Sequence, residues 1–166
     1  DVDGDGRAEV IAGTEYSTPL NVHNSDGSLR WTTFEEVGSE GNATTPRRGI
    51  GLTQMQLVDL DRDGVREIIY GTQDGWIYAV KPQDGAELWR ANIVGEVVGL
   101  MPFPAALVAA SEYGELYSFD YRGELRWHFR IGEWIRASAR VEEYIVAAVE
   151  GGVLLAFDAD GRCVAA

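Results

Sequence analysis

Short runs of apolar residues, each closed by a glycine turn, recur along the chain at a nearly constant spacing. The pattern is clearest from Asp59 to Trp89, where an acidic loop is followed by two strand-like apolar runs, two glycine turns and a tryptophan. Short apolar runs bounded by turn residues predict β-strands, and Asp-Gly between two such runs predicts a hairpin. We therefore expect one supersecondary unit that the chain repeats from end to end.

The first two copies of the unit each begin with an acidic loop. Residues 1–9 read DVDGDGRAE and residues 59–67 read DLDRDGVRE, so their acids coincide when the two segments are aligned. A buried strand ending in Gly-Thr follows each loop, and then come a second strand, an Asp-Gly turn and a strand that carries tryptophan. The predicted strands are 10–14, 19–24, 29–31, 68–72, 76–81 and 88–89.

Two later copies lack the acidic loop but keep the order of strands. Their predicted strands are 96–101, 106–110, 115–120, 124–129, 134–139, 144–149, 153–158 and 163–166. Trp89 and Trp127 lie 38 residues apart, and Gly75, Gly114 and Gly152 are spaced by 39 and 38 residues. A period near 40 with four short strands is typical of a β-propeller blade.

The repeat predicts an all-β fold, a β-propeller of four-stranded antiparallel blades in a single domain. The blades fall at about 1–50, 51–94, 95–132 and 133–166, and a long insertion at 34–50 stretches the first repeat. The first copy lacks an innermost strand before Asp1, and the fourth ends as its outer strand begins, so about three and a half to four blades are present. We expect a partial arc of a larger propeller.

Trp31, Trp89 and Trp127 follow an Asp-Gly or Arg-Gly turn at equivalent positions of three copies. We expect each indole to dock against the adjacent blade rather than to stack on a ligand, because large aromatic side chains readily serve cores and interfaces. Blades depend on such contacts, since only stacking removes both faces of each sheet from water. The equivalent position of the fourth copy is Ala165.

Composition and charge narrow the classes of partner. The 166 residues are 45% hydrophobic, which suits a globular domain, and the formal net charge is -13. So acidic a chain has no basic patch for nucleic acid, and cations are the expected small partners. A single cysteine, Cys163, excludes an internal disulfide framework and multi-cysteine metal sites. No apolar run approaches the roughly 18 residues needed to cross a bilayer, and Asp1 opens on an acidic motif without a signal peptide, so we expect a mature piece or a fragment.

The acidic loops carry the explicit chemistry. In the second loop, carboxylates occupy positions 1, 3, 5 and 9, and Gly64 stands at position 6, where a sharp turn is needed. Four such groups crowded together without a cation repel each other by about 1 kcal/mol per pair at 4 Å in water. Calcium takes about six to eight oxygen ligands and tolerates irregular geometry better than magnesium does. The predicted calcium ligands are Asp59, Asp61, Asp63, the Val65 carbonyl and Glu67, and in the first loop Asp1, Asp3, Asp5, the Arg7 carbonyl and Glu9.

The alternative interpretation of these loops is a solvated turn rich in Asp and Gly. The glycine at position 6, the acid at position 9 and the occurrence of both at two equivalent places favour metal binding. Each loop joins the inner strand of a blade to the next strand, and neither contains a histidine or another water-activating base. We therefore expect a bound cation to be structural rather than catalytic.

The insertion at 34–50 is the best candidate for a partner-binding loop, because loops of this length between blades often carry binding function. The alternative is a disordered insertion. His23 and His128 stand alone at non-equivalent positions and are expected on the surface or on a strand face. Asn42-Ala43-Thr44 matches a glycosylation sequon, which matters only in a eukaryotic secreted protein. Phosphate-cradling, nucleophile-elbow and zinc-protease patterns are absent from the sequence.

Two repeat families are similar to this pattern. The segment 79–89, AVKPQDGAELW, resembles the tryptophan-docking motif of PQQ-like (quinoprotein-like) propeller repeats, and the two acidic loops resemble the calcium loops of FG-GAP or VCBS-type repeats. Together the two resemblances cover nearly the whole chain. They imply a propeller whose blades run from inner strand to outer strand. They imply little about activity, because such repeats occur in enzymes, adhesins and assembly factors.

These observations favour a noncatalytic, calcium-binding scaffold in an extracellular or periplasmic protein. We expect it to bind a protein or carbohydrate ligand through 34–50, to bind no nucleic acid, to have no membrane span, and to self-associate through its open blade edges. One alternative is a fragment of a propeller enzyme, either a quinoprotein dehydrogenase, whose neighbouring cysteine pair is missing here, or a polysaccharide lyase. The other is an outer-membrane assembly scaffold, which would bind unfolded or membrane-protein segments. No catalytic residue and no residue for an organic cofactor is predicted.

Overall fold

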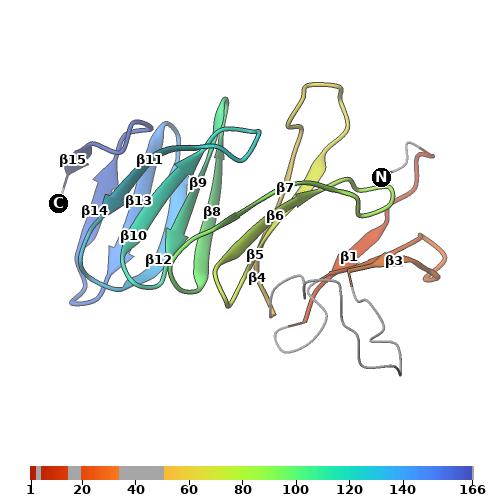
Figure 1. Ribbon diagram of the computed structural model, residues 1–166, viewed down its shortest axis with the longest axis horizontal. Helices are drawn as coiled ribbons and strands as arrows, with labels where there is room; N and C mark the ends of the chain where they lie inside the picture. Colours follow the sequence, from red (N-terminus) through yellow and green to blue (C-terminus); the bar gives the residue numbers. More distant parts are fainter. Residues whose placement is uncertain (3–4, 15–19, 34–50, 166) are drawn as a thin grey trace.

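The computed structural model describes residues 1–2, 5–14, 20–33 and 51–165, and within these ranges all regular structure is β-strand. The strands form four separate sheets, and within each sheet every strand pairs antiparallel with the next strand along the chain (Figure 1). Tight turns rich in glycine join the strands, as the sequence pattern predicts. The expected all-β fold is therefore confirmed.

The four sheets follow the chain in order. The first contains β1 (Val10–Ala12), β2 (Asn21–His23) and β3 (Leu29–Thr32), and the second contains β4 (Leu52–Val58), β5 (Glu67–Thr72), β6 (Trp76–Val80) and β7 (Glu87–Asn92). The third contains β8 (Val97–Phe103), β9 (Ala106–Ser111), β10 (Glu115–Phe119) and β11 (Leu125–Arg130), and the fourth contains β12 (Ile135–Val141), β13 (Tyr144–Val149), β14 (Leu154–Phe157) and β15 (Cys163–Ala165). The predicted strands coincide with these elements to within a few residues. Only β4 was given no range by the sequence pattern.

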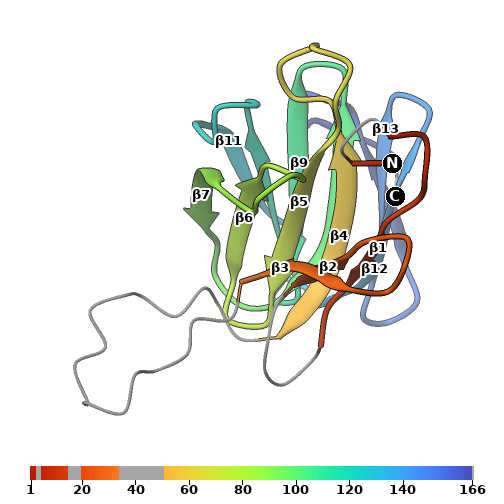
Figure 2. The same ribbon diagram turned by 90° about the vertical axis from the view of Figure 1, so that its right-hand side faces the viewer.

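The sheets stand side by side in an open arc. Figure 1 shows them in chain order, with the first sheet at the right and the fourth at the left, and Figure 2 looks along the row from the first sheet. The first strands of consecutive four-stranded sheets, β4, β8 and β12, contact each other and so form the inner edge of the arc. Antiparallel sheets of four strands arranged radially in this way form a β-propeller, which confirms the predicted fold.

The hydrophobic core lies between the sheets rather than inside any one of them. One cluster joins the first and second sheets, and two more join the second to the third and the third to the fourth. In the middle cluster, Ile69 and Ile77 of the second sheet pack against residues such as Leu107 and Phe119 of the third. Each sheet is therefore stabilised mainly by its neighbours, as in other stacked repeats.

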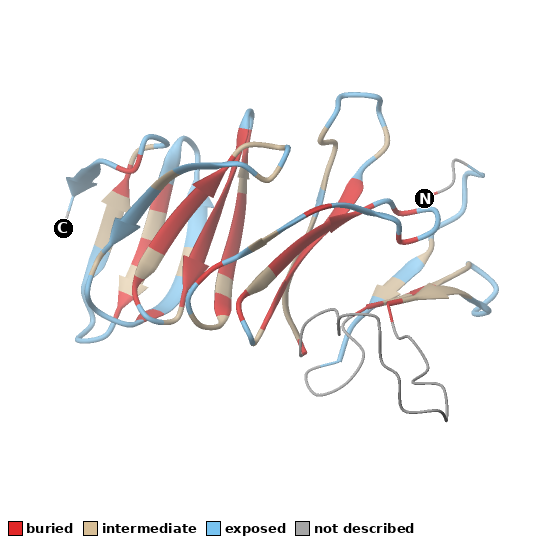
Figure 3. Cartoon of the chain, in the orientation of Figure 1, coloured by how far each residue is buried: buried red, intermediate tan, exposed pale blue. Residues whose placement is uncertain are grey.

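Burial along the second strands shows which sheets are covered on both faces. Every residue of β5 and of β9 is buried, whereas β13 alternates between buried and more exposed positions (Figure 3). In β13, Ile145, Ala147 and Val149 face the third sheet and are buried, while Val146 and Ala148 on the other face are only half-buried. Among the described residues, the far face of the fourth sheet is thus left uncovered.

Three tryptophans lock neighbouring sheets together at their outer strands. The indole Nε1–H groups of Trp31, Trp89 and Trp127 donate hydrogen bonds to the carbonyls of Pro82, Tyr121 and Ala159, at 2.9, 3.0 and 3.1 Å. Each indole also covers a turn glycine of the next sheet. A Cβ placed on Gly85, Gly123 or Gly161 would lie only 2.7, 2.9 or 3.0 Å from a ring atom. The predicted docking of each tryptophan on the adjacent blade is confirmed.

The strand register shows which residue of the fourth sheet stands at the position of the docking tryptophan. Trp89 pairs with Ala79 and Trp127 pairs with Ser118, each next to the irregular step in the register of its outer strand pair. In the fourth sheet the residue at this place is Ala165, which pairs with Ala156. The fourth sheet therefore has no indole to donate to a following blade.

Candidate metal centre

The second acidic loop connects β4 to β5 at one end of the second sheet. Its backbone makes a sharp turn in which Arg62 has a φ of 67° and Gly64 has a φ of 91°. A φ in this region suits glycine because a Cβ would clash with the backbone. The turn folds the loop back on itself, so the carboxylates of acids two residues apart in sequence can lie on the same side of the loop.

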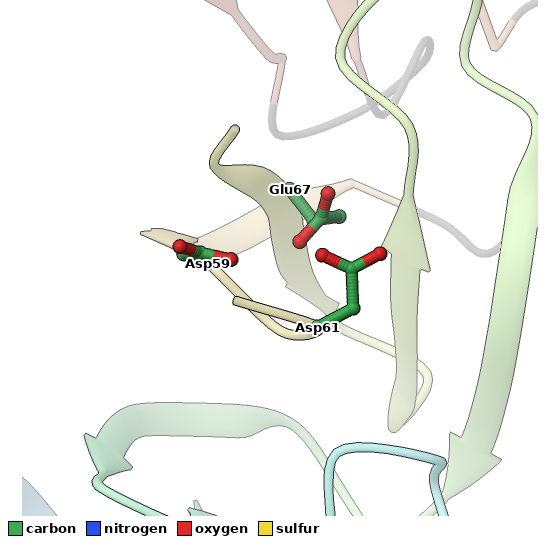
Figure 4. A group of neighbouring side chains, drawn as sticks. All are labelled: Asp59, Asp61 and Glu67. Carbon is green, nitrogen blue, oxygen red and sulfur yellow. The ribbon is translucent and has the colours of Figure 1, made fainter. Parts of the chain in front are cut away.

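Three carboxylates converge inside this loop. Asp59, Asp61 and Glu67 each offer an oxygen that lies within 4.8 Å of the oxygens of the other two, and Figure 4 shows Asp61 and Glu67 pointing toward each other. Glu67 is only 5% exposed. The Oδ1 atom of Asp59 is buried and has no hydrogen-bond partner within the described part of the chain. A buried carboxylate oxygen without a partner is costly, and a cation placed among the three groups would satisfy it.

Backbone amides hold one oxygen of each converging carboxylate in place. Leu60 N donates to Glu67 Oε2 at 2.8 Å, Gly64 N donates to Asp59 Oδ2 at 3.1 Å, and Asp63 N donates to Asp61 Oδ1 at 3.1 Å. Each of the three side chains thus has one oxygen held by a backbone amide of the same loop. This arrangement orients the oxygens before any cation arrives, which reduces the entropy lost on binding.

Burial raises the pKa of Glu67 above its ordinary value. The hydrogen bond from Leu60 N lowers this pKa, and the nearby carboxylates of Asp61 and Asp63 raise it, so that the net shift is upward. The protein thus holds an acid in a place where its charge is disfavoured. Among the described residues, no lysine or arginine forms an ion pair with these acids to offset the repulsion. The residues present therefore fit a hard divalent cation, whose charge would reverse this cost.

Asp63 and Val65, two further predicted ligands, lie just outside the converging group. The Asp63 carboxylate accepts a hydrogen bond from Val65 N at 2.7 Å and so braces the turn. Its oxygens are not among those that meet within 4.8 Å. The structure therefore brings together Asp59, Asp61 and Glu67, and ligation by Asp63 and the Val65 carbonyl stays a prediction.

The first acidic loop repeats the same backbone bracing. Val2 N donates to Glu9 Oε2 at 2.7 Å, Gly6 N donates to Asp1 Oδ2 at 2.9 Å, and Arg7 N donates to Asp5 Oδ1 at 2.8 Å. These bonds correspond one for one to those made by Leu60, Gly64 and Val65 in the second loop. The Glu9 side chain is 2% exposed. Asp3, the predicted ligand between Asp1 and Asp5, lies outside the described residues. Metal binding by the first loop therefore stays a prediction.

A groove of about 380 Å³ separates the two acidic loops. It is lined by Asp1, Val2, Leu57, Gly64, Val65, Arg66 and Gln83. The insertion 34–50, which the sequence favours for partner binding, lies outside the described residues together with its sequon at Asn42. The lining of this groove includes Asp1 and Val65, two of the predicted metal ligands.

One polar cluster was missed by the sequence pattern. His128 stacks on Tyr117, with ring centroids 4.4 Å apart, and its Nε2 lies 3.2 Å from Glu115 Oε2. Tyr117 also donates its hydroxyl to Glu115, and burial with this contact raises the pKa of Tyr117 to about 12. His128 thus lies on a strand face, as expected, in a cross-strand contact between β10 and β11. Stacking of this kind gives no sequence signal, because the partner depends on register.

Two family descriptions match the chain. The first 70 residues match the FG-GAP-like repeat, and residues 73–164 match the PQQ-like family described as outer membrane protein assembly factor BamB. The second match covers more than half of the sequence. The chain belongs to this BamB family. The family pair confirms the resemblance drawn from the docking motif and the acidic loops. A search of curated proteins finds no match for this BamB-family chain.

Solved structures share the fold of this BamB-family chain at low sequence identity. BamB from Moraxella catarrhalis has a TM-score of 0.69 and 19% identity, over 97% of this chain and 46% of that one. The computationally designed Ika4 protein has a TM-score of 0.69 and 16% identity, over 95% of both chains. BBS1N, solved in complex with ARL6DN, has a TM-score of 0.70 and 14% identity, over 95% of this chain and 49% of that one. The chain thus spans about half the length of BamB.

Proposed function

We propose that the chain is a noncatalytic propeller module that binds calcium and serves as a scaffold in an extracellular or periplasmic protein. The observation that carries the proposal is the second acidic loop, where three carboxylates converge and Asp59 Oδ1 is buried without a partner in the described residues. Calcium would hold the connection between β4 and β5 and so fix how the second sheet enters the stack. The match to FG-GAP-like repeats supports this choice of cation.

Calcium titration by calorimetry tests the proposal. We expect saturable binding at pH 7 that raises the melting temperature, since a ligand that binds only the folded state stabilises it. The double variant Asp61→Ala with Asp63→Ala should lose this site, while Asp74→Ala, an acid outside the loop, should keep it. Binding should weaken at pH 5, because the raised pKa of Glu67 lets protons compete with the cation. Equal heats and equal melting temperatures with calcium and with a chelator would contradict the proposal.

The scaffold would also self-associate through the uncovered face of the fourth sheet. Nine residues of this face are equivalent, by strand register, to residues of the third sheet whose side chains face the fourth sheet. None of the nine is charged. They are Ala137, Ala139, Val141, Tyr144, Val146, Ala148, Leu154, Ala156 and Ala165. Val141 is 51% exposed and Leu154 is 62% exposed. An apolar sheet face of this kind favours association with another sheet.

Sedimentation equilibrium tests the role of this face. The wild-type chain should show a mass above the 18.2 kDa of one chain. Leu154→Asp should lower the apparent association constant at least tenfold, because it places a charge in the apolar face. Leu125→Asp is the matched control, since Leu125 is 56% exposed on the outer strand of the third sheet and lies away from this face. A wild-type mass of one chain at high concentration would contradict self-association.

A role in outer-membrane protein assembly is the second candidate, favoured by the family description that matches residues 73–164. A scaffold of this type would present its loops and its groove to a protein partner. Binding of unfolded membrane-protein segments would favour this role over carbohydrate binding. The described part of the chain contains no helix able to span a membrane.

A further inference from the structure

Two exposed aromatic side chains contact each other where the third sheet meets the fourth. Tyr113 is 45% exposed and Trp134 is 44% exposed, and no other phenylalanine, tyrosine or tryptophan of the described residues is as exposed. Their ring centroids lie 5.4 Å apart, with an angle of 85° between the ring planes. Neither residue belongs to the core clusters that join the sheets. The two rings therefore form a small surface open to solvent, which we call the aromatic patch.

Three connecting segments at one end of these sheets carry the aromatic patch and its surroundings. They are 112–114 between β9 and β10, 131–134 between β11 and β12, and 150–153 between β13 and β14. Ile131 N donates to Gly114 O and Glu150 N donates to Trp134 O, both at 2.8 Å, so the segments form one surface. In the second sheet the acidic loop precedes β5 and the equivalent turn follows it. The aromatic patch therefore lies at the other end of the sheets from the candidate metal centre.

The repeat shows that the fold requires no aromatic side chain at either position. In the second, third and fourth sheets, the turn after the second strand closes with a hydrogen bond from its glycine amide to the carbonyl three residues earlier, at 3.1 to 3.2 Å. The carbonyl just before each inner strand accepts a hydrogen bond from this turn, at 2.8 to 3.3 Å. By these bonds, the residues equivalent to Tyr113 are Asp74 and Gly151, and those equivalent to Trp134 are Gly51 and Glu96. The two rings are therefore additions to the common framework.

An arginine of the chain itself already lies on the indole of the patch. The guanidinium carbon of Arg136 is 5.3 Å from the centroid of the Trp134 ring, which is within the range of a cation–π contact. Arg136 also pairs with Glu150, since its Nη2 atom lies 3.0 Å from Oε1 of that residue. An aromatic face and a carboxylate thus hold one guanidinium group together. This contact shows which side chain the surroundings of the patch accommodate.

The charge around the two rings indicates the kind of partner that fits them. The three connecting segments contain the acids Glu112, Glu133 and Glu150, and they contain no lysine or arginine. Such a surface repels phosphates and anionic polysaccharides and attracts cations, and arginine can both stack on an aromatic ring and pair with a carboxylate. We propose that the aromatic patch is a docking surface for a basic segment of a partner protein. Arginine side chains of this segment stack on Tyr113 and Trp134 and pair with the acids beside them.

Calorimetric titration at low salt with an octapeptide that alternates arginine with glycine tests the proposal. We expect saturable binding to the wild type and a dissociation constant at least tenfold higher for Trp134→Ala, which removes the ring but keeps the net charge of -13. Trp134→Phe should stay within threefold of the wild type, because it keeps an aromatic face for the guanidinium group. An octapeptide that alternates glutamine with glycine should not bind.

Two further variants separate the patch from other parts of the chain. Tyr144→Ala is the matched control, since Tyr144 is a 37% exposed aromatic residue at the opposite end of β13. Asp61→Ala with Asp63→Ala removes two acids of the candidate metal centre and leaves the patch intact. Both should bind the arginine peptide as the wild type does. Far-UV circular dichroism should be the same for every variant.

Three results would overturn the proposal. One is the absence of binding between the wild type and the arginine peptide. Another is a dissociation constant for Trp134→Ala within twofold of the wild type, because the peptide would then bind through charge alone. The third is tighter binding of a neutral oligosaccharide, cellohexaose, that is lost in Trp134→Ala, because the rings would then serve a carbohydrate ligand.

Discussion

Replacing Trp89 with alanine should destabilise the chain by about 3–5 kcal/mol, the usual cost of removing a large buried aromatic side chain. Trp89 is 9% exposed and belongs to the cluster that joins the second and third sheets. Its loss would uncover Gly123, remove the hydrogen bond to Tyr121 O and leave that carbonyl without its indole donor. Because sheets are stabilised mainly by their neighbours, the effect should reach both sheets.

Urea unfolding followed by circular dichroism measures this loss, with Leu88→Ala as the matched control. Leu88 is the preceding residue of the same strand and is 43% exposed, so its truncation should cost less than about 1 kcal/mol. Trp89→Phe should fall between the two variants, since it keeps a ring over Gly123 but loses the N–H donor. Equal losses for Leu88→Ala and Trp89→Ala would show that the indole does not join the sheets.

Gly114→Ala should destabilise the chain far more than Gly152→Ala, although both glycines occupy the same turn of their sheets. Gly114 has a φ of 79° and Gly152 a φ of 81°, so both substitutions carry the left-handed cost of about 1–2 kcal/mol. Only at Gly114 does a neighbouring sheet approach closely. A Cβ there would lie 2.1 Å from the backbone oxygen of Glu133, while at Gly152 it would meet nothing within 4 Å.

The difference between these two variants isolates the contact between sheets. Glu133 belongs to the connection from the third sheet to the fourth, and Gly114 O accepts a hydrogen bond from Ile131 N in the same connection, at 2.8 Å. Moving this backbone should add about 1–3 kcal/mol, as overpacking usually does. Thermal unfolding of the two variants provides the comparison. Equal melting temperatures would mean that the connection shifts freely and does not hold the sheets together.

The repeat made most of the fold predictable. Recurring glycine turns and tryptophans at equivalent positions place the strands, and the docking of Trp31, Trp89 and Trp127 follows from that equivalence. What the sequence could not say is which carbonyl each indole would reach, because that partner lies 51 or 32 residues further along, in the next sheet. The contact depends on how sheets stack, which no local pattern encodes.

The sequence pattern predicted no residue range for strand β4. Polar residues, among them Gln54 and Gln56, alternate with apolar ones in this strand, so it contains no continuous apolar run. Most of its residues are half-buried. The inner edge of the arc tolerates polar side chains, so the usual apolar signal of a buried strand is weak there. The existence of an inner strand followed only from the position of the acidic loop after it.

The convergence of three acids in the second loop was predictable from the sequence, but the geometry of the loop was not. Spacing identified Asp59, Asp61 and Glu67 as acids that could converge, and the structure brings them within 4.8 Å. Spacing could not show that Asp63 would brace the amide of Val65, nor that Asp59 Oδ1 would be buried without a partner in the described residues. Those features depend on the backbone turn at Arg62 and Gly64.

The measurement that tests the central claim most directly is the crystal structure of the chain grown with saturating calcium, with anomalous diffraction to locate the ion. We expect a peak about 2.3–2.6 Å from one carboxylate oxygen of each of Asp59, Asp61 and Glu67, with about six to eight oxygen ligands in all. The Oδ1 atom of Asp59 should be one of them. Absence of a peak at this loop, with Asp59 Oδ1 hydrogen-bonded to water instead, would contradict the account.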